Sequence, residues 1–286
     1  MGSLREIKDR IGSVKSTLKI TSAMKLVASS KLRKSQKAIE TMLPYRRALE
    51  DILSRVGSSG EQLSRLCSCR EGGRTAIIAV ASNSSLCGAF NVNAVKATLK
   101  EASKHDNTDI IGIGRKMAEA LRRAGFPQAR DWSSLIGKPS YAAAGEFACD
   151  IVRKFTEGEY SEVIFVYNHF ISTSRQEVVV ERYLPLPAED VTDDVTEIKD
   201  EYNPYILEPS AEEIADIILP KVLELKVYTV LLDSAASEHA ARTIAMQTAT
   251  DNAEDILGEL TLEYNKGRQQ KITAEILDLV GGNIHE

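Results

Sequence analysis

The first 56 residues carry one hydrophobic repeat that never changes phase, and this repeat restricts the possible folds more than any other feature. Positions spaced alternately three and four residues apart, from Leu4 to Val56, are apolar at twelve of sixteen places. A repeat of 3.5 residues is typical of a coiled-coil helix. At about 1.5 Å per residue the helix would be roughly 80 Å long. No compact domain could enclose it, so a partner helix is expected.

A second long helix is expected at the other end of the chain. Ser210 and Glu213 have the spacing of a capping box, which marks a helix start, and the helical pattern then continues to Val280. Seven alanines lie between Ala235 and Ala253, and small residues let another helix approach closely. The simplest arrangement pairs the two terminal helices antiparallel. Only the far end of such a rod would lack a core of its own.

Between these helices the pattern changes to short apolar runs separated by helical segments. Residues 75–82 and 109–114 indicate buried parallel strands joined by a crossover helix, and further strands are expected at 162–172 and 177–186. The sequence therefore predicts an α/β fold, with a Rossmann-like domain inserted into a long antiparallel coiled coil. The predicted segments are an N-terminal helix at 1–56, a linker at 57–74, the Rossmann-like domain at 75–186, an acidic connecting loop at 187–208 and a C-terminal coiled-coil helix at 209–286.

Charge is distributed unevenly along the chain. The net charge of −5 argues against a general nucleic-acid-binding protein. Residues 1–56 nonetheless contain thirteen Lys and Arg against five Asp and Glu, whereas residues 187–213 contain ten acidic residues against one Lys. No signal-peptide core is present at the N-terminus, and no apolar run approaches the roughly 20 residues that span a bilayer. A soluble compartment is expected, with the four cysteines reduced.

No group of residues has the spacing of a catalytic or metal-binding site. Gly112 and Gly114 supply half of a dinucleotide-binding fingerprint, but Met117 stands where the third glycine should be. The loop "SNSSLCGAFN" contains neither a Walker lysine nor a nucleophile elbow. Its polar residues are therefore expected to form turns: Ser84, Ser85 and Cys87. We predict no catalytic residue, no cofactor and no metal site.

The basic first helix is the remaining candidate for a binding function. Lys25 lies in the apolar repeat itself, where a polar residue often sets the register or faces a partner. Ile20, Met24 and Val27 form a second apolar stripe, and a helix with two apolar faces contacts more than one neighbour. Two alternatives stay open. One is a dinucleotide-binding enzyme built on the central domain; the other is a basic coiled-coil protein that binds nucleic acid, although base-stacking aromatic residues are scarce in the first helix.

The chain resembles the γ subunits of F-type ATP synthases along essentially its whole length. Four stretches carry the resemblance: "REIKDRIGSVKSTLKITSAMKLVASSKLRK", "SLCGAFN", "SEHAARTIAMQTATDNA" and "YNKGRQQKITAEILDLVGG". The chain departs from the family where "SNSSLCG" replaces the common "SDRGLCG", and where "DLVGGNI" follows the final "EI" in place of "SGA". The first departure puts a polar role for residues 83–85 in question, and the second affects the tip of the last helix.

This resemblance implies a rotor subunit without catalytic activity of its own. It implies that the terminal helices enter the cavity of a hexamer of α and β subunits, while the central domain meets the ε subunit and the membrane c ring. Proton flow through the c ring would then be coupled to the conformational cycle of the catalytic β subunits. One copy per complex is expected, peripheral to the cytoplasmic face of a bacterial inner membrane, with no nucleic acid bound.

The resemblance also implies roles for single residues. Met24 and the facing segment "RQQKITAE" are expected to bear on the hexamer. The full set of expected hexamer contacts is Met24, Lys25, Lys31, Arg33, Arg268, Gln269, Thr273 and Glu275. The expected contacts with ε or the c ring are Tyr205 and Glu208.

Overall fold

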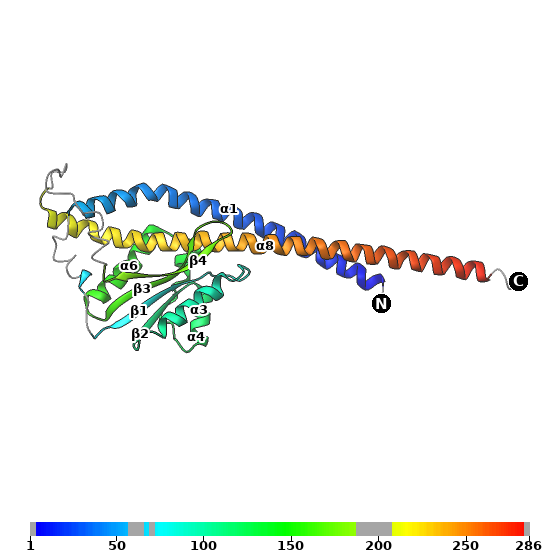
Figure 1. The fold of residues 1–286 in the computed structure, drawn as a ribbon, viewed down its shortest axis with the longest axis horizontal. Coiled ribbons are helices and arrows are strands. Elements are labelled where there is room, and N and C mark those ends of the chain that lie inside the picture. The colour runs from blue at the N-terminus through cyan, green and yellow to red at the C-terminus, as the bar shows by residue number, and fades with distance from the viewer. Residues whose placement is uncertain (1–3, 57–65, 69–71, 187–207, 283–286) are drawn as a thin grey trace. The chain divides into compact units, whose positions relative to one another are not determined.

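The computed structural model describes residues 4–56, 66–68, 72–186 and 208–282. The chain divides into two compact units, one of residues 1–29 with 242–286 and one of residues 30–241. Two long helices supply residues to both units, namely α1 (Leu4–Val56) and α8 (Ala211–Gly282) (Figure 1). Together with a central sheet and its covering helices, they confirm the predicted fold class. The predicted linker and acidic loop lie largely outside the described residues.

In the first unit α1 and α8 run antiparallel. Leu4 lies against Gly267, and the hydroxyl groups of Thr21 and Thr250 are 2.9 Å apart. Every position of the hydrophobic repeat from Leu4 to Ala28 is buried or partly buried. The matching repeat on α8 consists of Met246, Thr250, Ala253, Leu257, Leu260, Tyr264 and Gly267, all buried or partly buried. The 3.5-residue spacing therefore selects the contacting face of α1, as predicted, and the structure shows the same spacing on α8.

The second unit is built around a four-stranded sheet of order β2-β1-β3-β4. Its strands are β1 (Arg74–Val80), β2 (Thr108–Ile113), β3 (Tyr160–Phe170) and β4 (Gln176–Leu184). Ile78 of β1 pairs in parallel with Ile111 of β2 and with Phe165 of β3, whereas β4 joins β3 as an antiparallel hairpin. The two parallel pairs require crossover connections, which the intervening helices provide.

Helices cover both faces of this sheet (Figure 1). The helices α3 (Phe90–Ala102) and α4 (Arg115–Arg123) lie on one face, and α6 (Tyr141–Thr156) and α8 lie on the other. Alternate residues of β1 therefore enter two different cores, with Ile78 in one and Ile77 in the other. Burial on both faces explains why this strand is a continuous apolar run without alternation. One short helix, α5 (Ser133–Gly137), was too brief to leave a periodic signal in the sequence.

The α8 helix is an integral part of the second unit. Six of its apolar residues belong to the core on the α6 side of the sheet: Leu219, Leu223, Val227, Val230, Leu231 and Ala235. Asp233 of α8 accepts a hydrogen bond from the Phe170 N–H at 2.8 Å and pairs with His169 Nδ1 at 2.5 Å. Ser237 Oγ donates to Asn168 O at 2.9 Å. These polar contacts fasten α8 to the end of β3. Among the described helices, none is long and apolar enough to cross a membrane.

Candidate interaction surfaces of the helix pair

A polar layer interrupts the apolar seam of the first unit. Lys25 Nζ donates to Gln247 Oε1 at 2.6 Å, and Gln247 Nε2 donates to Asp251 Oδ1 at 2.6 Å. One turn away, Thr250 Oγ1 donates to Thr21 Oγ1 at 2.9 Å. A buried polar residue is tolerated where its partner lies opposite, and a shifted register would separate the two. Lys25 therefore serves the pairing of the two helices, and its contact with a hexamer stays a prediction.

Large apolar side chains remain exposed on the first unit outside this seam. On α1 the exposed fractions are 60% for Ile20, 66% for Leu26 and 56% for Val27, and Met24 is partly buried. On α8 the exposed members are Ile244, Ile256 and Leu262. A single exposed apolar residue needs no explanation, but repeated ones along a helix pair indicate a surface that another protein covers. The second apolar stripe predicted from the sequence is thus exposed.

The far end of α8 continues beyond the start of α1. Gly267 packs against Leu4, the first described residue of α1, and every residue from Arg268 to Leu277 is exposed. Ile272 and Ile276 are 42% and 54% exposed and, being four residues apart, lie on one face of the helix. As expected from the sequence, the far end of the helix pair lacks a core of its own.

All four expected hexamer contacts of α8 lie on this extension: Arg268, Gln269, Thr273 and Glu275. The polar contacts found there are internal to the helix. Thr273 Oγ1 donates to Gln269 O at 2.9 Å, and Lys271 Nζ is 3.7 Å from Glu275 Oε1. The expectation that this segment faces Met24 is wrong. Residues near Met24 lie opposite Gln247, about 20 residues earlier in α8, which is roughly 30 Å along the helix.

The remaining expected contacts lie in different places. Lys31 and Arg33 are exposed on the part of α1 that belongs to the second unit. Glu208 is exposed just before α8, and Tyr205 lies outside the described residues. The structure therefore brings together Met24, Lys25 and the polar layer, and it groups the four residues of the extension, but it does not join these sets into one site.

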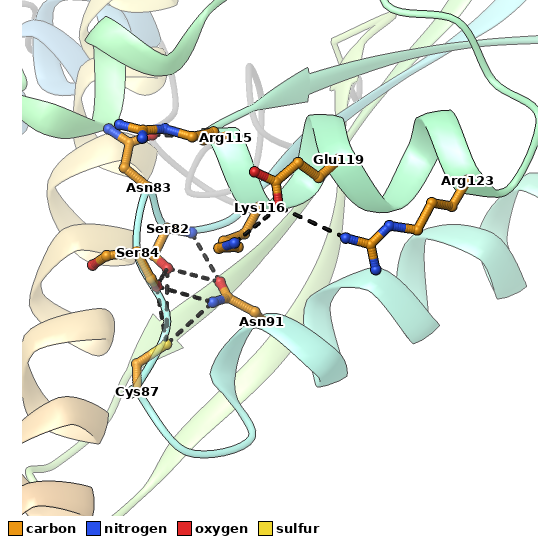
Figure 2. A network of polar contacts seen from close by, with 9 residues as sticks. All are labelled: Ser82, Asn83, Ser84, Cys87, Asn91, Arg115, Lys116, Glu119 and Arg123. Carbon is orange, nitrogen blue, oxygen red and sulfur yellow. Dashed lines mark hydrogen bonds and ion pairs between the residues drawn. The ribbon is translucent and has the colours of Figure 1, made fainter.

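A second polar cluster lies in the loop after β1 and connects three elements of the second unit (Figure 2). Asn83 Oδ1 accepts a hydrogen bond from the Arg115 N–H at 3.0 Å, and Asn83 Nδ2 donates to Ser133 O at 2.8 Å. Asn91 Oδ1 accepts bonds from the backbone N–H and the hydroxyl of Ser82, at 3.0 and 2.9 Å. Residue 83 therefore has a polar role despite the departure from the family sequence, and that role is to cap α4 and hold α5.

This cluster also explains the incomplete dinucleotide fingerprint. Gly114 has φ +98°, and a Cβ at this position would lie 2.0 Å from Ala81 O. The Lys116 N–H at the start of α4 already donates to Ser82 O, and the side chain of Met117 is fully buried. The glycines are thus required by close packing of the chain on itself, so they carry no argument for a nucleotide site. Cys87 is buried among Ser82, Ser84 and Asn91, as a turn residue would be.

Comparison with known proteins assigns the family. A family model described as ATP synthase matches residues 3–283. The chain is 47% identical to the ATP synthase gamma chain of Bacteroides thetaiotaomicron, over 99% of this chain and 100% of that one. This chain belongs to the ATP synthase gamma chain family. The resemblance seen in the sequence is thereby confirmed, and a gamma chain is a non-catalytic subunit of the synthase.

Solved structures agree with the gamma chain fold. A chain from the mitochondrial ATP synthase of Euglena gracilis, solved as OSCP, F1 and c-ring in rotational state 3, aligns with a TM-score of 0.66 at 20% identity, covering 99% of this chain and 94% of that chain. A chain from the central stalk and c-ring structure of the Tetrahymena thermophila mitochondrial enzyme aligns with a TM-score of 0.57 at 23% identity, covering 80% and 99%. This gamma chain therefore has the fold of a central-stalk subunit.

Sequence reasoning on this gamma chain missed two groups of residues. Gln247 and Thr250 lie inside the stretch "TIAMQTATDNA", but only the antiparallel register shows that they oppose Lys25 and Thr21. The apolar residues of the extension were also missed, because Ile272 and Ile276 follow the same helical pattern as the paired residues before them. The signal that could have exposed them is the greater length of the second helix, which must outrun its partner.

Proposed function

We propose that the chain is the rotor shaft that couples ion flow through a membrane ring of c subunits to conformational cycling of catalytic β subunits. The observation that carries this proposal is the extension of α8, where residues 268–277 are exposed on every side. An isolated helix with exposed Ile272 and Ile276 gains stability when a surrounding protein covers it. The cavity of a hexamer of α and β subunits would provide such a surrounding.

Asymmetry gives this shaft its mechanism. At the level of Lys25 the shaft is a helix pair, whereas beyond Gly267 the described residues form a single helix. Neither section has threefold symmetry, so three equivalent β subunits would each meet a different face. A partner that contacts two conformations unequally shifts their equilibrium by the difference in contact free energy. Turning the shaft would therefore exchange the conformations among the β subunits, and forcing those conformations to change would turn the shaft.

The extension can be tested by removing its apolar surface in the assembled complex. Burying an isoleucine side chain contributes about 1.5–3 kcal/mol, so Ile276→Ser should weaken retention of the chain in a complex with α and β subunits by about tenfold or more. Native mass spectrometry of the co-expressed subunits measures that retention. Ile217→Ser is the matched control, because Ile217 is 59% exposed at the opposite end of α8. Equal retention of the Ile276 and Ile217 variants would contradict the proposal.

Met24 is proposed to bear on the β subunits. Met24→Lys would place an extra ammonium on this surface, where a wrong ion pair should uncouple ATP hydrolysis from proton pumping in membrane vesicles. Met24→Leu keeps the apolar bulk without the charge and should pump normally. Normal pumping by both variants would remove Met24 from the bearing surface.

The exposed cations of α1 are proposed to face acidic loops of the hexamer. Charge contacts persist as a shaft turns, whereas a tightly interdigitated apolar interface would resist rotation. Replacing Lys31, Arg33 and Lys34 by Gln should therefore lower coupled synthesis or assembly, more strongly at low salt than at high salt. Unchanged rotation and unchanged synthesis at low salt would exclude this role.

The opposite end of the shaft is proposed to meet the ε subunit and the c ring, with Tyr205 and Glu208 in the contact. Glu208 is exposed, as such a role requires. We propose one copy per complex, peripheral to the cytoplasmic face of a bacterial inner membrane. Glu208→Cys should form a cross-link to ε or c in purified complex with a short bifunctional reagent. A cysteine at exposed Lys138, a residue not assigned to this contact, is the control. Equal yields at both positions would refute the assignment.

A further inference from the structure

A cavity of about 470 Å³ lies between α6 and α8 in the second unit. Most of its wall is apolar and comes from Leu66, Ala148, Val152, Pro220 and Leu223. Pockets that bind small organic molecules have volumes of about 300–1,000 Å³ and predominantly apolar walls with a few polar groups. The cavity meets both conditions, and nothing in the shaft function described above uses it.

The polar groups of the cavity converge on one carboxylate. Cys149 Sγ donates to Glu224 Oε1 at 3.8 Å, and burial followed by the nearby Glu224 carboxylate raises the pKa of Tyr141. The carboxylate packs closely on α6, because a Cβ added at Gly145 would lie 3.3 Å from Glu224 Cδ. The Cys149 thiol and a close backbone contact therefore hold the Glu224 carboxylate at the cavity wall.

Glu224 also supplies the unbalanced charge of the cavity. Two other charged residues line the wall, but they pair with each other, since Arg153 Nη1 is 3.6 Å from Glu157 Oε1. Arg153 is further held by Asp150 at 2.6 Å. Among the described residues, no Lys or Arg forms an ion pair with Glu224. Burial, and next the negative charge of Glu224, raise the pKa of the Cys149 thiol. The Glu224 carboxylate therefore acts electrostatically on this thiol.

We propose that this cavity binds a small organic cation with an apolar body, its ammonium group beside Glu224 and its apolar part against Val152 and Leu223. An apolar wall with one unbalanced carboxylate is complementary to that class of molecule. An anion would be repelled by Glu224, and a small inorganic cation would leave the apolar wall unfilled. The site goes beyond the rotor function and does not depend on it.

Cys149 provides a direct probe of the charge preference. Two methanethiosulfonate reagents are compared on the full-length chain, one carrying a trimethylammonium group and the other a sulfonate. Cys149 should react about tenfold faster with the trimethylammonium reagent. Peptide mass spectrometry separates Cys149 from Cys67, which serves as an internal reference. Glu224→Gln should reduce the ratio of the two rates at Cys149 severalfold. Glu157→Gln is the matched control and should leave the ratio near the wild-type value, because that carboxylate is already paired. An unchanged ratio in Glu224→Gln would overturn the charge assignment.

Occupancy of the apolar wall needs a second measurement. A non-reactive probe, phenethyltrimethylammonium, should slow the reaction of Cys149 with neutral N-ethylmaleimide severalfold while leaving Cys67 unaffected. Tetramethylammonium, which has the charge without the aromatic body, should protect much less. Val152→Phe should abolish protection by filling the cavity, and an unchanged thermal unfolding temperature shows that this variant is folded. Equal protection by both ammonium ions, or none by either, would overturn the proposed site.

Discussion

Replacing Gly114 by alanine should destabilise the second unit severely, because Gly114 holds a conformation and a contact that only glycine allows. Its φ and ψ are 98° and 141°, a region that costs any other residue about 1–3 kcal/mol. An added Cβ would lie 2.0 Å from Ala81 O, so the end of β1 and the start of α4 would have to move apart. Displacing packed core elements costs typically ~1–3 kcal/mol more. The expected loss is therefore about 4 kcal/mol of a total stability near 5–15 kcal/mol.

The fluorescence of Trp132 measures this loss in urea. It is the single tryptophan of the chain and packs edge-on against Phe147, with ring centroids 4.9 Å apart, inside the second unit. With a denaturant slope near ~2 kcal/mol per molar, the Gly114→Ala midpoint should fall by about 2 M. Gly125→Ala is the control: its φ is +90° but nothing lies within 4 Å of an added Cβ, so only about 1–2 kcal/mol should be lost. Similar urea midpoints for the two variants would show that Gly114 is not required for the close approach to Ala81 O.

Three further predictions concern polar contacts. Burial raises the pKa of Asp233, so the wild-type native state should lose stability as the pH rises from ~4 through the raised pKa. Asp233→Asn lacks this titration. Chemical denaturation at several pH values should therefore show the stability of Asp233→Asn increasing relative to the wild type across that window. Thr250→Val removes the hydroxyl that donates to Thr21 Oγ1 and should cost about 1 kcal/mol, whereas adding Thr21→Val should recover part of the loss. Hydrogen exchange of the helix pair measures both losses, and strictly additive losses would exclude coupling. Ser140→Ala removes the hydroxyl that accepts a hydrogen bond from the Ala143 N–H and should cost about 1 kcal/mol of stability. Ser134→Ala, at an exposed position, should be neutral. Equal urea midpoints for the two variants would argue against Ser140 as the N-cap of α6.

Periodic features of this chain were predictable because they depend on local spacing. The apolar repeat identified the buried side of α1, since every described repeat position from Leu4 to Leu53 is buried or partly buried. The capping box before α8 is also present, with the Glu213 N–H donating to Ser210 Oγ at 3.2 Å. The absence of a core at the far end of the helix pair was also predicted, and its physical cause is the greater length of α8.

Contacts between distant residues were not predictable in the same way. Gln247 could not be matched to Lys25 until the register of the two helices was known, and that register depends on packing along the whole pair. Asn83 could not be identified as a cap for α4, because 32 residues separate it from Arg115. The presence of α5 likewise depends on tertiary packing. Which residues touch other subunits depends on surfaces that this chain does not contain.

The contribution of α8 to the core of the second unit has a consequence for how the chain is made. Leu219 and Ala235 complete a core whose strand residues begin at Ala76. At synthesis rates of about 5–20 residues per second, roughly 7–30 s would pass between the appearance of β1 and that of this part of α8. During that interval the face of the sheet that α6 and α8 share is covered by α6 alone, and exposed apolar surface on a nascent chain favours aggregation. The second unit can therefore complete its core only late in translation, after this part of α8 has been synthesised.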